Sequence, residues 1–292
     1  MISSAANDKA RTQAGIVQFG VEMKLAPIFS AGLALLTAAC GLDAGSTASH
    51  ADNYETVVRQ ADDARKSGNL DMAIPLYGRA LQTNPGGLEA KLGLGQSYLS
   101  IGAGDEAAAQ FRDVLAKRSG DPIARRGLAA ALLYMGQPTL AEQQLDLVLQ
   151  ADANDYRALN TLGVCLDMQG RHTEAQARYR QGIELAPDYV PLRSNMGLSL
   201  AISGQVQEAI AQLAPLASGR GADGRVRQNL AFAYAMAGDL ANALQASRRD
   251  LDETSAQRQL SYFMQLRSLP PDARSVAVRG NPYFFPQAGR GA

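Results

Sequence analysis

Six glycines recur every 34 residues along this 292-residue chain, and each is followed five residues later by an alanine. The glycines are Gly68, Gly102, Gly136, Gly170, Gly204 and Gly238. The alanines are Ala73, Ala107, Ala141, Ala175, Ala209 and Ala243. A fixed period of this length, without insertion or deletion, indicates a repeat array rather than one globular core. The period therefore favours a binding scaffold over an enzyme.

Each copy predicts two helices separated by a turn. The copies begin at Tyr54, Leu88, Pro122, Tyr156, Val190 and Gly224. Apolar residues at positions 7 and 11 and a small residue at position 8 share one helical face, which allows a second helix to approach closely. The glycine at position 15 suits a left-handed helix end. The second helix carries the alanine and a bulky apolar residue at position 24, and Pro85 and Pro187 end it.

This pattern resembles the tetratricopeptide repeat (TPR), which implies an all-α, right-handed superhelical solenoid. Six repeats would span 54–257, divided as 54–87, 88–121, 122–155, 156–189, 190–223 and 224–257. Ser247 stands where a large apolar residue is usual, so either the second helix of the sixth repeat is weak or a following segment packs there differently.

Two segments follow the repeats. Leu260, Phe263, Met264 and Leu266 lie at near-helical spacing and predict a capping helix over 258–270. Residues 271–292 contain proline, glycine and arginine and predict a flexible tail without regular structure. The aromatic cluster at 283–285 leaves two interpretations: a tail that has no role or folds back on the array, or a short docking motif.

The N-terminal region resembles a bacterial lipoprotein signal. Residues 23–39 place a Met and a Lys before an apolar run too short to span a bilayer, and small residues precede Cys40. The resemblance implies cleavage before Cys40 and diacylation of its thiol, with residues 40–53 as a tether; two chains anchor a protein stably. Thr37 stands three residues before the cysteine, where the lipoprotein family usually has leucine. The alternatives to a lipoprotein signal are an uncleaved anchor and an ordinary cleaved signal.

The start and destination of the chain follow from the same region. Residues 1–22 are long and polar for the start of a signal and carry Asp8 and Glu22, so Met23 is the better start and 1–22 an upstream extension. Gly41 stands where the lipoprotein family has Asp for inner-membrane retention. The resemblance therefore implies an outer-membrane anchor facing the periplasm.

Composition and motifs give no sign of catalysis. The 28 basic and 28 acidic residues cancel, which does not favour a nucleic-acid partner. The two histidines, His50 and His172, lack paired metal-ligand spacing, and we expect His172 to lie exposed in a turn. No phosphate-binding loop occurs. We expect no catalytic site, metal, cofactor or small-molecule substrate. Cys165 is expected to be a buried, inert thiol, a reactive one being the alternative.

The first helices predict a peptide-binding groove, because peptide-binding TPR proteins use positions 2, 5, 6, 9, 12 and 13 of these helices. An apolar strip edged by Asn and Arg results, and Asn can pair with both N–H and C=O of a peptide backbone. The groove residues are Arg126, Tyr134, Arg157, Asn160, Val164, Met168, Asn195, Leu198, Ile202, Arg225, Asn229, Phe232 and Met236. The alternative is that some of them contact neighbouring helices or the tail.

A second resemblance lies near the C-terminus. Arg227–Ala231, Gly238, Arg248–Leu251 and Gln259–Leu269 are similar to TadD, the TPR lipoprotein of tight-adherence (Flp pilus) secretion systems. This implies a pilus assembly factor whose partner is the secretin or another pilus component. Another envelope TPR lipoprotein, such as a type IVa pilotin or an outer-membrane biogenesis factor, is the first alternative, and a TPR-containing enzyme subunit is the second.

Overall fold

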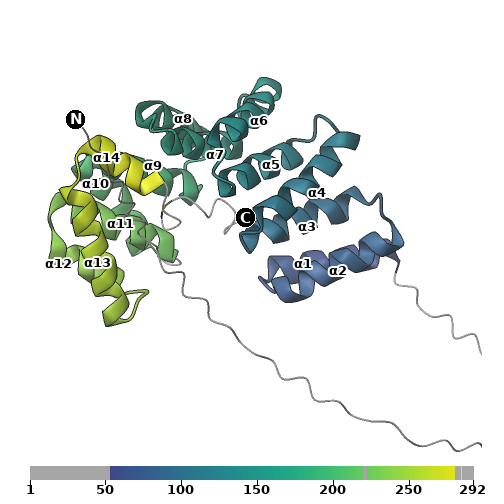
Figure 1. Ribbon diagram of the computed structural model, residues 1–292, viewed down its shortest axis with the longest axis horizontal. Coiled ribbons are helices and arrows are strands. Elements are labelled where there is room, and N and C mark those ends of the chain that lie inside the picture. The colour runs from purple at the N-terminus through teal and green to yellow at the C-terminus, as the bar shows by residue number, and fades with distance from the viewer. Residues whose placement is uncertain (1–52, 220–221, 280–283, 285–292) are drawn as a thin grey trace, which may run out of the picture. The chain divides into compact units, whose positions relative to one another are not determined.

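The computed structural model describes residues 53–219, 222–279 and 284. Regular structure in this part of the chain consists of fourteen α-helices and no strand (Figure 1). None of the described helices is both long and apolar enough to cross a bilayer. The predicted extension, signal peptide and Cys40, the tether as far as residue 52, and most of the predicted tail beyond 279 lie outside the described residues.

Helices alternate in two sets, and each helix packs against the next one along the chain. The first helices are α1 (Tyr54–Lys66), α3 (Leu88–Ser100), α5 (Pro122–Tyr134), α7 (Tyr156–Met168), α9 (Val190–Ile202) and α11 (Gly224–Ala237). The second helices are α2 (Leu70–Thr83), α4 (Gly104–Lys117), α6 (Pro138–Ala151), α8 (His172–Leu185), α10 (Val206–Ser218) and α12 (Leu240–Ser247). First helices also contact the first helices of adjacent repeats. The predicted all-α repeat solenoid is confirmed.

The turn glycines adopt the conformation that their spacing predicts. All six have φ between +68° and +90°, and no other described glycine has a positive φ. A residue with a Cβ is strained in this region, because the Cβ approaches the following carbonyl. The regular glycine is therefore needed to end each first helix before the chain reverses into the second.

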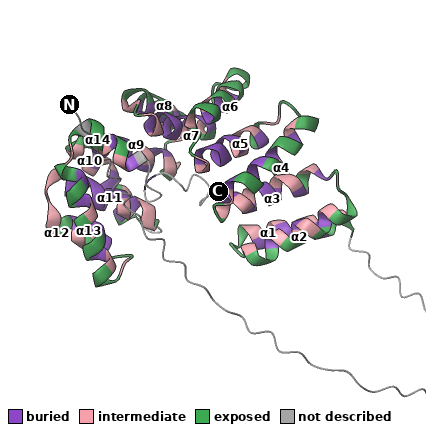
Figure 2. Ribbon diagram, in the orientation of Figure 1, coloured by how far each residue is buried: buried purple, intermediate pink, exposed green. Residues whose placement is uncertain are grey.

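Small residues of the first helices receive the bulky residue at position 24. A Cβ built on Gly163 falls within 3.0 Å of the Tyr179 ring, and one built on Gly197 falls equally close to Leu213. Both bulky side chains are almost completely buried. Buried residues run through α5, α7, α9 and α11 (Figure 2). The array is thus held by interlocked pairs of small and large side chains.

The sixth repeat differs from the others in the way that Ser247 suggests. Helix α12 has 8 residues, whereas the other second helices have 13 or 14. The buried Ser247 hydroxyl lies 2.5 Å from Oε1 of Gln259, on α13 (Glu253–Ser268). Both alternatives therefore hold: the helix is short, and the following helix packs against it and α11. Helix α13 begins before the predicted capping helix because Asp252 caps it by accepting from the Ser255 N–H.

The tail prediction needs a correction at its beginning. Residues 271–279 form α14 (Pro271–Arg279), which packs against α13 and α9. Pro270 and Pro271 are unsuited to the interior of α13, but a proline is well suited to the first position of a helix, where its missing N–H is not needed. Val278 is completely buried, so the helix also has an apolar side chain to pack.

Candidate functional site

The predicted groove residues lie on α5, α7, α9 and α11, which contact one another in chain order. We call this face of the four helices the first-helix surface. Asn195 Nδ2 on α9 donates to Asn160 Oδ1 on α7 at 3.0 Å, and Asn229 Nδ2 on α11 donates to Ser194 Oγ on α9 at 3.0 Å. The structure therefore brings the predicted residues together on adjacent helices and links their amides across repeats.

Seven of the thirteen residues are at least partly accessible. They are Arg126, Tyr134, Arg157, Asn160, Met168, Asn195 and Arg225. Arg126 forms an ion pair with Asp155, which also caps the N-terminus of α7. The Arg157 guanidinium lies 5.1 Å from the centre of the Tyr156 ring. Two of the cations are thus oriented by neighbours on the same surface.

The other six residues are buried. They are Val164, Leu198, Ile202, Asn229, Phe232 and Met236. Phe232 makes edge contacts with Phe263 at 5.3 Å and with Phe284 at 4.9 Å between ring centres. This is the alternative in which residues of the strip contact neighbouring helices or the tail. Their part in binding a partner stays a prediction, and with this packing they are not available to one.

A buried polar network beside the first-helix surface was not predicted. Asp167, at position 12 of α7, is fully covered. Its Oδ1 lies 2.7 Å from both His172 Nδ1 and Ser199 Oγ, and its Oδ2 accepts from the Tyr179 hydroxyl at 3.0 Å. His172 Nε2 lies 2.8 Å from the Ser275 hydroxyl on α14. The expectation that His172 is exposed is wrong, because α14 packs where a bare turn was expected and leaves its side chain 13% exposed.

The sequence held one signal of this network: a carboxylate within the apolar face of a helix, between Leu166 and Met168. Burial raises the pKa of Asp167, because the charged form is desolvated, and the hydrogen bonds with His172, Ser199 and Tyr179 oppose that rise. Burial also raises the pKa of Tyr179, and the neighbouring Asp167 adds to the rise. A carboxyl group with three such partners is a satisfied buried group.

Contacts within hydrogen-bond distance join Ser275 to His172 and His172 to Asp167, which is the connectivity of a serine hydrolase triad. Acyl transfer also needs an accessible hydroxyl and N–H donors for the oxyanion. Ser275 is only 8% exposed and lies in the middle of α14, where backbone N–H groups are used by the helix itself. The geometry therefore supports a different role, in which the network fixes α14 onto α7, α8 and α9. Among the described residues, no group of three or more His, Cys, Asp or Glu could hold a metal ion.

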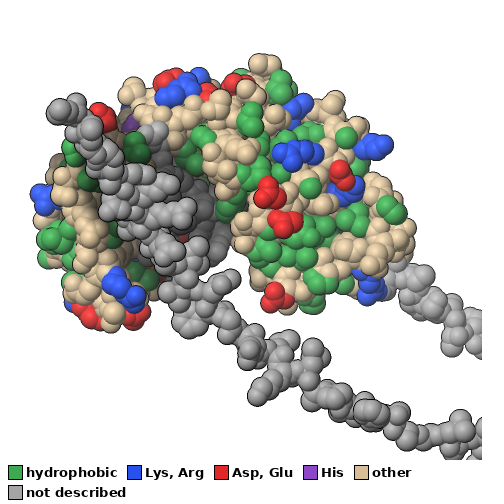
Figure 3. Space-filling view, viewed as in Figure 1, with side chains coloured by type: hydrophobic (Ala, Val, Ile, Leu, Met, Phe, Trp, Pro, Cys, Tyr) green, Lys and Arg blue, Asp and Glu red, His purple; other side chains and the backbone are tan. Residues whose placement is uncertain are grey.

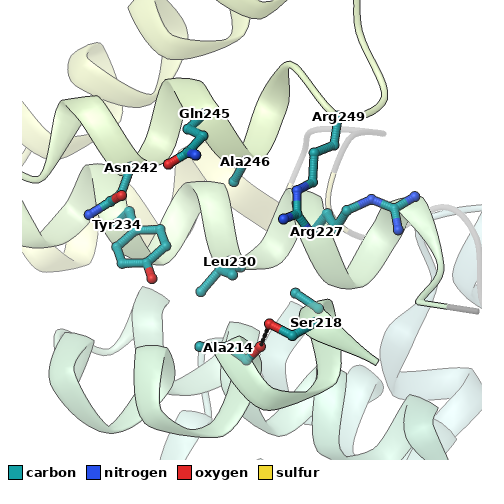
Figure 4. A pocket seen from close by; sticks show the side chains of 10 residues that line it. Ala214, Ser218, Arg227, Leu230, Tyr234, Asn242, Gln245, Ala246 and Arg249 are labelled. Atoms are coloured by element: carbon teal, nitrogen blue, oxygen red, sulfur yellow. Dashed lines mark hydrogen bonds between the residues drawn. The ribbon is translucent and has the colours of Figure 1, made fainter. Parts of the chain in front are cut away.

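Residues of the second resemblance tie α11 to the turn after α12. Arg227 Nε donates to Asp250 Oδ2 at 2.7 Å. Beside this pair, a hollow of about 150 Å³ lies among α10, α11 and α12. Figure 4 shows Tyr234 and Asn242 at one end of it and Arg227 and Arg249 at the other. Asp250, within the Arg248–Leu251 part of the resemblance, thus has a structural role.

The charges of the chain are mixed on the face shown in Figure 3. Hydrophobic, basic and acidic side chains are interspersed over the first three repeats. The formal net charge is zero. Mixed signs of this kind give no long-range attraction for a polyanion.

Cys165 should resist thiol reagents in the folded protein. It is completely buried, and burial raises the pKa of its thiol, so little reactive thiolate is present. In a Cys40→Ala background, we expect alkylation at pH 8 to be about a hundred-fold slower without urea than with it, on the order expected for a buried thiol. Fast labelling of the folded protein, followed by mass spectrometry, would show that Cys165 is accessible.

A sequence model described as tetratricopeptide repeat matches residues 58–122 and 126–190. The uncharacterized protein y4yS of Sinorhizobium fredii is 40% identical over 98 residues, which cover 34% of this chain and 54% of that protein. Cellulose synthase operon protein C of Pseudomonas fluorescens is 30% identical over 164 residues, 53% of this chain and 13% of that protein. The chain thus spans about half of the first relative and a small part of the second.

Solved structures share the fold at low sequence identity. A tetratricopeptide repeat protein from Parabacteroides merdae has a TM-score of 0.63 at 15% identity, covering 75% of this chain and 87% of its own. PilW, described as a widely conserved type IV pilus biogenesis factor, has a TM-score of 0.60 at 17% identity, covering 72% and 98%. Pseudomonas aeruginosa pilF has a TM-score of 0.56 at 15% identity, covering 73% and 96%. The family model thus identifies residues 58–122 and 126–190 as tetratricopeptide repeats, and the solved structures show that the described residues share the fold of such proteins.

Proposed function

We propose that this TPR protein is a lipid-anchored scaffold on the periplasmic face of the outer membrane. It would bind a secretin or another component during assembly of a tight-adherence (Flp) pilus secretion system. The observation that carries the binding role is the first-helix surface, where Arg157, Asn160 and Asn195 remain partly accessible on adjacent helices. Non-catalytic binding to protein partners is the general property of the repeat family and needs no enzymatic site.

The paired amides of this surface suit an extended peptide. Asn195 uses one N–H for Asn160, and each asparagine amide has two donors and an acceptor oxygen. The pair therefore keeps capacity to donate to a peptide C=O and to accept from a peptide N–H. Arg157, stacked near Tyr156, adds a positive charge beside them. We expect a peptide with backbone exposed at this point and an acidic or aromatic side chain next to it.

Two lines support the pilus assignment. The C-terminal residues resemble TadD lipoproteins, and the fold is shared with PilW and with pilF, of which the first is described as a pilus biogenesis factor. The same neighbours favour a type IVa pilotin as the second candidate. The secretin that is recovered, from a tight-adherence or from a type IVa system, separates the two.

The anchor is tested by metabolic labelling with palmitate. The chain should incorporate label in the native host, and Cys40→Ala should incorporate none, because Cys40 would supply the only acylated thiol. The variant should also leave the membrane fraction. Equal labelling of the two chains would contradict the anchor.

The function is tested by affinity capture from membranes with the lipidated chain as bait. We expect recovery of the tight-adherence secretin or another pilus component, in amounts that fall with Cys40→Ala. Recovery of no pilus component from cells that make the pilus would contradict the proposal.

A further inference from the structure

The C-terminal segment, defined here as α14 and Phe284, has a polar anchor in the array. The Ser275 hydroxyl meets His172 Nε2 at 2.8 Å, and His172 is held in turn by the buried Asp167 at 2.7 Å. The partners are 103 residues apart in the chain. A single side chain of α14 is therefore joined to a network that orders α7, α8 and α9.

The segment also has two apolar anchors. Val278 is fully buried on α14, and Phe284 is 8% exposed. The Phe284 ring lies 4.9 Å from Phe232 and 6.1 Å from Phe263, measured between ring centres. The edge contact with Phe232 adds to the stabilisation that burial provides. Phe284 thus covers a predicted groove residue of α11.

The buried anchors of α14, Ser275 and Val278, lie on one side of the helix, and the other side is exposed. Val276 is 60% exposed, and Asp272 and Ala273 are also exposed. Helix α14 has nine residues and packs against α9 and α13, and a helix of this length is marginal without tertiary contacts. Segments held by few buried contacts open at a lower free energy than the whole fold. The segment is therefore placed on the surface like a bound peptide.

We propose that the C-terminal segment is a releasable internal ligand of the first-helix surface at α9 and α11. A partner segment with a hydroxyl, an aliphatic and an aromatic anchor takes its place. The partner in this inference rests on the proposed function, whereas release of the segment does not. Tethering gives the segment an effective concentration in the millimolar range, so a free peptide competes only when an anchor is weakened.

The experiment uses the full chain and a fluorescein-labelled peptide of its own residues 271–287, followed by fluorescence anisotropy. The wild-type chain should bind the peptide weakly, because its own segment occupies the site. Phe284→Ala should bind it at least about ten-fold more tightly, since the chain's own segment then loses its aromatic anchor. Ser275→Ala removes one hydrogen bond and should give a gain of a few fold. Val276→Ala, in the same helix but exposed, should behave like the wild type.

The inference would be overturned if Phe284→Ala and Ser275→Ala chains, folded by circular dichroism, bound the peptide no better than the wild type. The segment would then be a fixed part of the fold. It would also be overturned by a wild-type dimer that Phe284→Ala dissociates, because the segment would then bind a second copy.

A second readout separates this inference from the proposed function. Phe284→Ala bait should capture several-fold more pilus component than wild-type bait. If the peptide binds as expected but no pilus component is captured by either chain, the proposed function fails and the internal ligand stands.

Discussion

Gly163→Ala should lower the stability of the array by about 2–3 kcal/mol, although it adds a single methyl group. The added Cβ would fall within 3.0 Å of the Tyr179 ring. The ring has little room to move, because Tyr179 is buried and its hydroxyl donates to Asp167 at 3.0 Å. Helix α7 or α8 must shift instead. The urea midpoint, followed by circular dichroism, measures the loss.

Gly78→Ala is the matched control for this change. Gly78 lies inside α2, and a Cβ at that position has nothing within 4 Å. Alanine in a helix interior should stabilise the protein by about 0.5–1 kcal/mol relative to glycine. Opposite shifts of the two midpoints are expected. A Gly163→Ala midpoint equal to that of the wild type would show that the interlocking of small and large residues does not limit stability.

Asp167→Ala should cost about 3–5 kcal/mol, comparable to removing one partner of a buried charged pair. It would leave the hydroxyls of Tyr179 and Ser199 and the ring of His172 without their common partner. Asp167→Asn keeps the shape and one acceptor oxygen, so it should cost less. Asp113→Ala, at an exposed carboxylate paired with Lys91, should change stability by about 0–1 kcal/mol. Urea titrations compare the three, and equal midpoints for Asp167→Ala and Asp113→Ala would show that the network contributes little.

The raised pKa of Asp167 also predicts the direction in which stability changes with pH. Because burial raises the pKa above its ordinary value of 3.8, the folded protein holds this proton to a higher pH than the unfolded chain does. The part of the stability that comes from this retained proton is therefore full below pH 3.8 and is lost as the pH rises through the folded pKa. Asp167→Asn, which does not titrate, should remove this part of the pH dependence of the urea midpoint.

The repeats could be predicted from sequence because each one is specified locally. The positive φ of the six glycines and the small residue opposite Tyr179 depend on residues less than one period apart. The contacts that could not be predicted join distant parts of the chain. Ser275 meets His172 across 103 residues, and Phe284 covers Phe232. Position 9 of a repeat faces solvent or a partner only if no other segment covers it, and the 34-residue pattern does not contain that information.

The same limit applies to the groove. The pattern placed thirteen residues on adjacent helices, but it could not separate Asn195, which is partly accessible, from Asn229, which is buried. Both asparagines occupy position 6 and both donate to the preceding first helix. The repeat pattern is the same at both positions, so it does not carry this difference.

Binding of a pilus component through the first-helix surface is tested most directly by changing residues that remain accessible there. The double variant Arg157→Glu, Asn195→Ala alters the surface on α7 and α9 without touching the buried aromatic cluster. Arg180 is exposed on α8, the second helix of the repeat that contains Arg157. Arg180→Glu is therefore a matched charge reversal outside the first-helix surface. With unchanged melting temperatures, capture of the secretin or other pilus component should fall about ten-fold or more for the double variant and stay at the wild-type level for Arg180→Glu. Equal capture by all three chains would contradict binding through this surface.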